Sequence, residues 1–198
     1  MKNLKQTLFA LLLMATTTAT VMAEDGISHI ELELGLGTTF GYNNVRNLEN
    51  QDLGFSLHTE GRYELRNVPL TVGAFASFGL NCRWYYYDFH GVPDRKTIDY
   101  YSGNFMATCD YNFRVHPKIK LFTGAGVGFC KYGTGANTTF SVRESDYVYV
   151  DNKGSFSAAF MPRVGAVFFD RLRLTFGYKL QERANSSAFL NIGYVIRF

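Results

Sequence analysis

The stretch that decides the fold is S-A-F-L-N-I-G-Y-V-I-R-F, from Ser187 to Phe198. Counting back from Phe198, every second residue is apolar or small. These residues are Phe198, Ile196, Tyr194, Ile192, Leu190 and Ala188. The residues between them are mixed in character. A period of two is typical of a β-strand with one apolar face and one tolerant face, so the stretch predicts a strand.

Seven earlier segments alternate in the same way. They are Ser28–Tyr42, Leu53–Leu65, Leu70–Tyr86, Tyr100–Phe113, Ile119–Tyr132, Ser155–Phe169 and Leu172–Leu180. The connections after the second, fourth and sixth segments are short. The other connections are longer, at Asn43–Asp52, Tyr87–Asp99, Gly133–Gly154 and Gln181–Ser186. Alternating short turns and long loops are typical of an up-and-down transmembrane barrel, so we predict an all-β, eight-stranded antiparallel β-barrel.

The aromatic residues on the predicted outward face agree with this arrangement. They gather near both ends of the segments, with Ala, Val and Leu between them. The short-turn end has Tyr63, Tyr111, Phe113, Phe168, Tyr194 and Phe198, and the long-loop end has Tyr42, Trp84, Tyr101, Phe129, Phe156 and Tyr178. Two aromatic girdles around an apolar band are expected of a membrane-spanning barrel. Pro162 disagrees, because it cannot donate a ladder hydrogen bond, and we expect a β-bulge there.

The N-terminus indicates export. Lys2 and Lys5 precede an apolar run, Leu8–Ala15, that is too short for a transmembrane helix of about 20 residues. Small and apolar residues then lead to Ala23, as at a signal-peptide cleavage site. The predicted organisation is a signal peptide at 1–23 and an outer-membrane barrel domain at 24–198.

The composition limits the classes of partner. Without Lys2 and Lys5 the chain has 18 basic and 17 acidic residues, a balance that argues against nucleic acid. The three cysteines, Cys82, Cys109 and Cys130, lie inside predicted strands and form no C-x-x-C motif. We therefore expect neither a metal site nor a disulfide framework, and no cofactor.

From Ser28 to Phe198 the pattern resembles the small eight-stranded outer-membrane barrels of Gram-negative bacteria, the group that includes OmpX and the OmpA transmembrane domain. The resemblance implies the bacterial outer membrane as the location. It implies outer-membrane lipids, lipopolysaccharide, periplasmic chaperones and the barrel assembly machinery as partners. It also implies that the end of the chain is the signal read during assembly. The residues concerned are Gly193, Tyr194, Ile196 and Phe198.

The predicted inward face carries charges of both signs. They are Glu31, Glu33, Glu60, Glu64 and Asp110, with Arg62, Arg83, Arg163, Arg173, Lys179 and Arg197. An eight-stranded barrel is just wide enough for side chains to fill it, and buried charges must be paired. We therefore expect a salt-bridge network that plugs the lumen, with a narrow channel as the alternative. The inward glycines of G-A-G-V-G-F, Gly124–Phe129, are expected to make room for large neighbours.

One row of residues suggests catalysis. Ser56, His58 and Glu60 alternate on the inward face of one strand, and some barrels of this size, such as the lipid A deacylase PagL, are Ser-His-acid hydrolases. Those sites face the lipid, however, whereas this row faces the lumen. Residues two apart also lie about 6.5–7 Å apart along a strand, which is long for a hydrogen bond. We therefore expect no catalytic residues and keep the lipid-directed enzyme as an alternative.

The longest connection, Gly133–Gly154, is the candidate partner-binding loop. Loops longer than about 15 residues are usually functional or disordered. Thr138–Val142 and Tyr147–Asp151 favour strand, so we predict a hairpin that continues the flanking strands and offers an edge to a partner. The candidate contact residues are Phe140, Arg143, Tyr147 and Tyr149. A loop that only shields the barrel mouth, or a ten-stranded barrel, is the alternative.

These features predict a non-enzymatic barrel that acts through its outer loops in adhesion, host interaction or envelope integrity. An extracellular or host ligand would then bind the loops. A lipid-directed enzyme should show a polar cluster on its lipid-facing surface. A channel should show a continuous lumen without paired charges.

Overall fold

The computed structural model describes residues 30–45, 48–66, 68–89, 92–134, 138–143, 146–150, 155–181 and 186–198. These residues form ten strands, which are β1 (Ile30–Val45), β2 (Leu48–Glu64), β3 (Leu70–Phe89), β4 (Val92–His116), β5 (Ile119–Thr134), β6 (Thr138–Arg143), β7 (Asp146–Val150), β8 (Ser155–Phe168), β9 (Leu172–Lys179) and β10 (Ser187–Arg197). The predicted signal peptide lies outside the described residues. In the described part of the chain no helix is long and apolar enough to cross a membrane.

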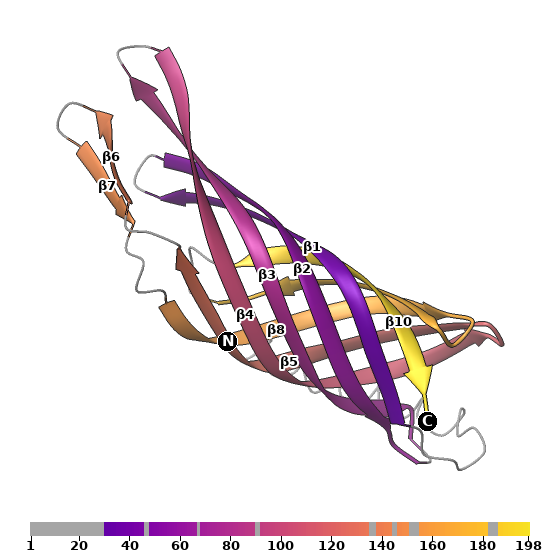
Figure 1. The fold of residues 1–198 in the computed structure, drawn as a ribbon. Coiled ribbons are helices and arrows are strands. Elements are labelled where there is room, and N and C mark those ends of the chain that lie inside the picture. The colour runs from indigo at the N-terminus through magenta and orange to yellow at the C-terminus, as the bar shows by residue number, and fades with distance from the viewer. Residues whose placement is uncertain are drawn as a thin grey trace, which may run out of the picture.

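Eight of these strands close into one antiparallel barrel, in the order β1-β10-β9-β8-β5-β4-β3-β2 (Figure 1). The barrel closes where β1 pairs with β10, from Glu31 opposite Arg197 to Phe40 opposite Ala188. Because β5 pairs directly with β8, the segment between them adds no strand to the wall. The prediction of eight strands is therefore confirmed, and the ten-stranded alternative is wrong.

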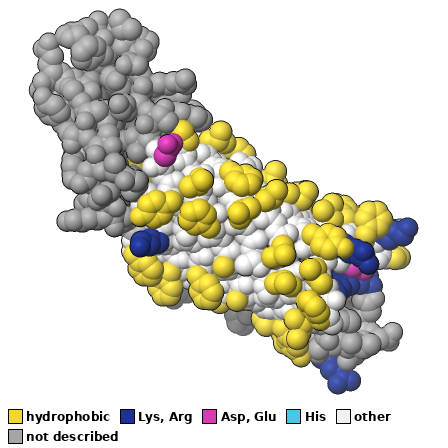
Figure 2. All heavy atoms as spheres, viewed as in Figure 1, with side chains coloured by type: hydrophobic (Ala, Val, Ile, Leu, Met, Phe, Trp, Pro, Cys, Tyr) yellow, Lys and Arg dark blue, Asp and Glu magenta, His cyan; other side chains and the backbone are white. Residues whose placement is uncertain are grey.

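The two faces of the wall follow the alternation seen in the sequence. On β9 exposed and buried residues alternate without a break from Leu172 to Lys179. The outward residues form a belt of exposed Leu, Ile, Val and Phe side chains around the barrel (Figure 2). Stacked or tilted ring pairs lie toward both ends, Tyr111 with Phe113 and Phe129 with Phe156. A belt of exposed apolar side chains of this extent is stable in lipid and not in water, so the strands span a membrane.

Two predicted loops are wrong. Asn43–Asp52 and Tyr87–Asp99 were expected to be loops, but β1 pairs with β2 as far as Val45 opposite Leu48. The β3–β4 ladder likewise continues to Phe89 opposite Val92. Both hairpins therefore project beyond the rest of the wall (Figure 1). Past the lipid no apolar face is required, so strict alternation ends although the strands continue.

Pro162 does not form the predicted bulge. Phe160 pairs with Leu180 and Arg163 pairs with Gly177, which is the same register on either side of the proline. The ladder from β8 to β5 also runs through Pro162, opposite Ala125, without a shift. The missing N–H is directed toward β9, where the ladder is interrupted at that position. The barrel loses one hydrogen bond there and keeps its inward and outward faces.

Inward glycines make room for lumen side chains, as predicted for Gly124–Phe129. A Cβ atom built on Gly124 would lie 2.1 Å from Asp110 Oδ1, and one on Gly128 would lie 2.6 Å from Met106 Cα. A Cβ atom on the outward Gly61 would meet nothing within 4 Å. The lumen is therefore filled to the backbone at these inward positions.

Candidate functional site

Arg163 on β8 is the centre of a buried ion-pair network in the half of the lumen nearest the short turns. Its Nη1 and Nη2 donate to the two carboxylate oxygens of Glu60 at 2.9 and 2.6 Å. Its Nε and Nη2 donate to Asp110 Oδ1 and Oδ2, both at 2.8 Å. One guanidinium therefore holds a carboxylate from β2, which lies across the barrel from β8, and a second carboxylate from β4, each with paired hydrogen bonds.

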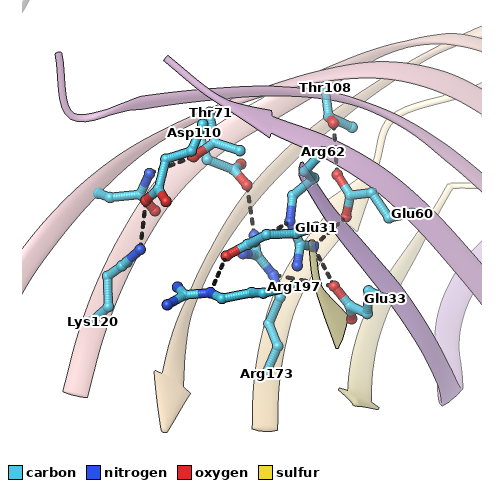
Figure 3. A network of polar contacts seen from close by, with 12 residues as sticks. Glu31, Glu33, Glu60, Arg62, Thr71, Thr108, Asp110, Lys120, Arg173 and Arg197 are labelled. Atoms are coloured by element: carbon cyan, nitrogen blue, oxygen red, sulfur yellow. Dashed lines mark hydrogen bonds and ion pairs between the residues drawn. The ribbon is translucent and has the colours of Figure 1, made fainter. Parts of the chain in front are cut away.

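The neighbouring charges complete the network (Figure 3). Arg62 donates to Glu33, and its Nε lies 3.1 Å from Glu31 Oε2. Arg173 donates to Asp110 Oδ2 at 2.6 Å and lies 3.5 Å above the ring of Phe122. The described network joins four carboxylates to four guanidinium groups. They are Glu31, Glu33, Glu60 and Asp110, with Arg62, Arg163, Arg173 and Arg197.

The network becomes more open at the short-turn rim. Arg197 Nε donates to Glu31 Oε1 at 2.9 Å, and its Nη2 lies 3.2 Å from Asp170 Oδ1. Lys120 pairs with Glu64 at 2.6 Å, with 22% of the Glu64 side chain exposed. The partner of Glu64 is thus a lysine that was not among the predicted lumen charges. The charges at the rim are thus paired but partly hydrated.

The half of the lumen nearest the long loops is different. Its centre is an apolar cluster, buried against the barrel wall. The cluster, called the lumen core below, consists of Phe75, Met106, Cys130, Tyr132, Ala159, Met161 and Phe189. Beside it, Thr39 donates to Asn81 at 2.7 Å and Asn81 donates to Ser102 at 3.0 Å. An apolar cluster in the lumen was not predicted, although the inward parity of these residues was available as a signal.

Two residues predicted for the charge network stand apart from it. Lys179 is buried beside the lumen core, with its Nζ 5.5 Å from the Phe189 ring centroid, and it has no ion-pair partner among the described residues. Placing Lys179 in the network was therefore wrong. Lys179 is the last residue of β9, opposite Ser187, at the long-loop end of the strand. This position separates it from the carboxylates. The side chain of Arg83 lies outside the described residues.

The Ser-His-acid row does not assemble into a triad. His58 Nε2 lies 3.0 Å from Glu33 Oε1, and its ring stacks on Phe75 at 5.7 Å. Glu60 instead accepts hydrogen bonds from Arg163 and from Thr108 Oγ1 at 2.6 Å. All three residues of the row are buried in the lumen, so they do not meet the lipid phase.

The remaining predicted residues belong to the C-terminal strand and to the Gly133–Gly154 segment. Tyr194, Ile196 and Phe198 of the predicted assembly signal face outward and are exposed, whereas Gly193 faces inward against Glu33. In the Gly133–Gly154 segment, β6 pairs with β7 from Thr138 opposite Val150 to Arg143 opposite Asp146. The predicted hairpin is confirmed, but it forms its own two-stranded sheet and does not continue β5 and β8. The side chains of Phe140, Arg143, Tyr147 and Tyr149 lie outside the described residues.

In the charged half of the described lumen the carboxylates and guanidinium groups are paired with one another. Paired charges fill one half and apolar side chains fill the other. Buried ion pairs are costly to separate, so the network connects distant strands of the wall. The surfaces available for molecular recognition are therefore the outside of the barrel and its projecting hairpins.

Comparison with known proteins agrees with this geometry. No protein-family model matches the chain, and no curated protein matches it in sequence. Among solved structures, the neisserial surface protein NspA matches at TM-score 0.51 and 13% identity, over 86% of this chain and 97% of that one. The chain has the fold of the small eight-stranded outer-membrane β-barrels. A weaker match is Ail of Yersinia pestis in complex with a heparin analogue, sucrose octasulfate, at TM-score 0.42 and 15% identity, over 85% of this chain and 99% of that one. Another is the N-terminal barrel domain of Pseudomonas aeruginosa OprF, at TM-score 0.37 and 14% identity, over 87% of this chain and 100% of that one.

Proposed function

We propose that this protein is a non-enzymatic barrel of the bacterial outer membrane that binds an extracellular partner through its projecting strands. In the proposed orientation in the outer membrane, the short turns face the periplasm and the projecting hairpins face the outside of the cell. Adhesion, host interaction and envelope integrity are the roles that such a surface would serve. The observation that carries the proposal is the length of β3 and β4 beyond the point where the wall ends.

The projecting part is a sheet with an unpaired edge. The ladder between β4 and β5 ends at Tyr100 opposite Thr134, whereas β3 and β4 remain paired as far as Phe89 opposite Val92. Eight residues of β4, Val92–Asp99, therefore lack a described ladder partner on one side. At about 3.3 Å per residue, this edge extends roughly 25 Å past the last β5 contact.

An unpaired edge can accept a strand from another protein. The main-chain N–H and C=O groups of the β4 edge supply the hydrogen bonds, and the sequence of the added strand is selected by side chains on either face. Pro93 cannot donate a main-chain hydrogen bond, so pairing is best supported over 94–99. The β6–β7 hairpin, with its tyrosines at 147 and 149, would offer a second contact surface beside it.

The test removes each projecting element while keeping the wall. In one variant residues 137–152 are replaced by a Gly-Ser linker. In a second, residues 85–96 are replaced by Asn-Gly, which joins Trp84 to Thr97, a pair that is already opposed in the ladder. Both variants are expressed in a bacterium that lacks the protein. Adhesion to epithelial-cell monolayers and to immobilised matrix proteins is then measured.

Both variants should insert normally and keep the heat-modifiable gel mobility of a folded barrel, because loops outside the wall contribute little stability. At least one should lose most of the adhesion that the unmodified protein confers. A matched control shortens the β1–β2 hairpin by replacing residues 43–50 with Asn-Gly, which leaves the β4 edge intact. Unchanged adhesion in both test variants, or failure of the 137–152 variant to insert, would contradict the proposal.

A further inference from the structure

Three cations lie at the short-turn end of the barrel on neighbouring turns and strands, and they are called the arc below. Lys118 lies on the turn between β4 and β5, Arg171 on the turn between β8 and β9, and Arg197 near the end of β10. Lys118 and Arg171 are exposed. Figure 2 shows Lys and Arg side chains gathered at this end of the barrel beside hydrophobic ones.

Backbone contacts fix the two turns against each other. Phe169 and Asp170 both adopt left-handed conformations, with φ of 53° and 56°, as a tight two-residue hairpin turn requires. The turn is closed by Arg171 N–H, which donates to Phe168 O at 3.0 Å. Phe169 N–H in turn donates to Lys118 O at 2.8 Å, so a backbone hydrogen bond joins the neighbouring turns into one unit.

A notch lies next to this unit because β9 is shorter than β10. The ladder between them ends at Leu172 opposite Tyr194, with one last bond from Val195 N–H to Arg171 O at 2.7 Å. β10 continues past this point because it still pairs with β1. The lining residues of the notch are Asp170, Arg171, Tyr194, Val195, Ile196 and Arg197.

The cations of the arc lie beside exposed aromatic side chains. Lys118 Nζ lies 5.9 Å from the ring centroid of Phe169, which is 67% exposed. Arg171 Nη1 donates to the Tyr194 hydroxyl at 3.3 Å. Exposed aromatic rings near the strand ends of a transmembrane barrel form a girdle at the level of the lipid headgroups, and Phe169 and Tyr194 lie near such ends. The arc is therefore held at headgroup depth, where the ligand it meets first is a lipid.

We propose that the Lys118–Arg171–Arg197 arc binds the phosphate of an anionic phospholipid in the leaflet at the short-turn end. The glycerol and upper acyl chains would lie over Tyr194 and Ile196, and the phosphate would enter the notch. Arg197 already neutralises Asp170, so Lys118 and Arg171 supply the attraction. This proposal is independent of the projecting hairpins and of any extracellular partner.

The test measures lipid selectivity in bilayers. The protein spanning residues 24–198 is reconstituted in phosphatidylethanolamine with a minor fraction of phosphatidylglycerol. The selectivity for spin-labelled phosphatidylglycerol over spin-labelled phosphatidylethanolamine is then read from the motionally restricted lipid signal. Lys118→Gln and Arg171→Gln are measured singly and together. Each cation removed should lower the selectivity about fivefold, and added salt should lower that of the unmodified protein.

Lys131→Gln is the matched control, because Lys131 is an exposed cation on the opposite part of β5, outside the notch. It should leave most of the selectivity in place. Gel mobility establishes that every variant is folded. The proposal is overturned if the double variant keeps the selectivity of the unmodified protein, or if Lys131→Gln lowers it as much. Displacement of the labelled lipid by millimolar inorganic phosphate would identify a free anion as the ligand and would also overturn it.

Discussion

The two halves of the lumen fill the same kind of space with opposite chemistry. Near the short turns, carboxylates and guanidinium groups from β1, β2, β4, β8, β9 and β10 meet in one network. Near the long loops, Met106, Met161 and Phe189 pack in the lumen core. Both halves are buried, and both rely on inward glycines that admit large neighbours.

The difference shows that, when the exterior is apolar, the interior can be filled either by paired charges or by apolar side chains. In a soluble protein the core must be apolar because burial of apolar surface drives folding. In this barrel the apolar surface faces lipid. The lumen therefore needs only to be filled by side chains, with a partner for each buried polar or charged group. Charged pairs connect distant strands with defined geometry, whereas the lumen core fills space with adaptable side chains such as Met.

The largest effect is expected from Arg163. Arg163→Met leaves Glu60 and Asp110 with too few donors, so the free energy of unfolding should fall by about 3–5 kcal/mol. Urea unfolding of the reconstituted barrel, followed by gel mobility, measures this change. Arg163→Lys keeps the charge but loses the bidentate geometry, so it should lose less. Wild-type stability in Arg163→Met would show that the network does not hold the wall together.

The lumen core should be less sensitive to a single deletion. Met161→Ala removes a fully buried side chain, and we expect a loss of about 2–3 kcal/mol in the same urea assay. Met161→Leu keeps the volume and should cost less than about 1.5 kcal/mol. If the alanine variant lost more than Arg163→Met, the ranking of the two halves would be reversed.

Glycine substitutions test how tightly the lumen is filled. Gly128→Ala would place a Cβ atom against the backbone at Met106, so it should destabilise the barrel by roughly 1–3 kcal/mol. Gly103 is the matched control on the same β4–β5 pair, because a Cβ atom there would meet nothing within 4 Å. Gly103→Ala should be neutral or stabilising by a few tenths of a kcal/mol. Equal effects at both positions would contradict a filled lumen.

The smallest effect is expected at the rim of the network. Among the described residues Glu64 pairs with Lys120 alone, and it is partly exposed, so Glu64→Gln should cost less than about 1 kcal/mol. Thermal shift in the gel-mobility assay would resolve this variant from Arg163→Met. A loss as large as that of Arg163→Met would mean that depth in the lumen does not determine the strength of an ion pair.

Much of this fold could be predicted from the sequence because lipid imposes a strict rule. From Ser187 to Phe198 and in seven earlier segments, each outward residue had to be apolar, so period two marked strands and faces. Pro162 was misread because the sequence does not show on which side of a strand an N–H is directed. The β1–β2 and β3–β4 extensions were missed because outside the lipid no alternation marks them.

The site was less predictable than the fold. Inward parity identified Glu60, Asp110 and Arg163 as lumen charges, but the partners depend on which side chains reach across the barrel. The register and the tilt of the strands decide which side chains meet, and neither can be derived from the sequence of one strand. The same limit explains why Lys179 was assigned to the network although it lies beside the lumen core.

The central claim is that the lumen is closed, so that the protein acts through its surface. Single-channel recording of the purified barrel in planar bilayers tests this most directly. The paired charges around Arg163 and the lumen core around Met161 should together block ion flow, and no stable conductance step should appear. Large, uniform conductance steps from the folded protein would contradict the claim and favour a channel.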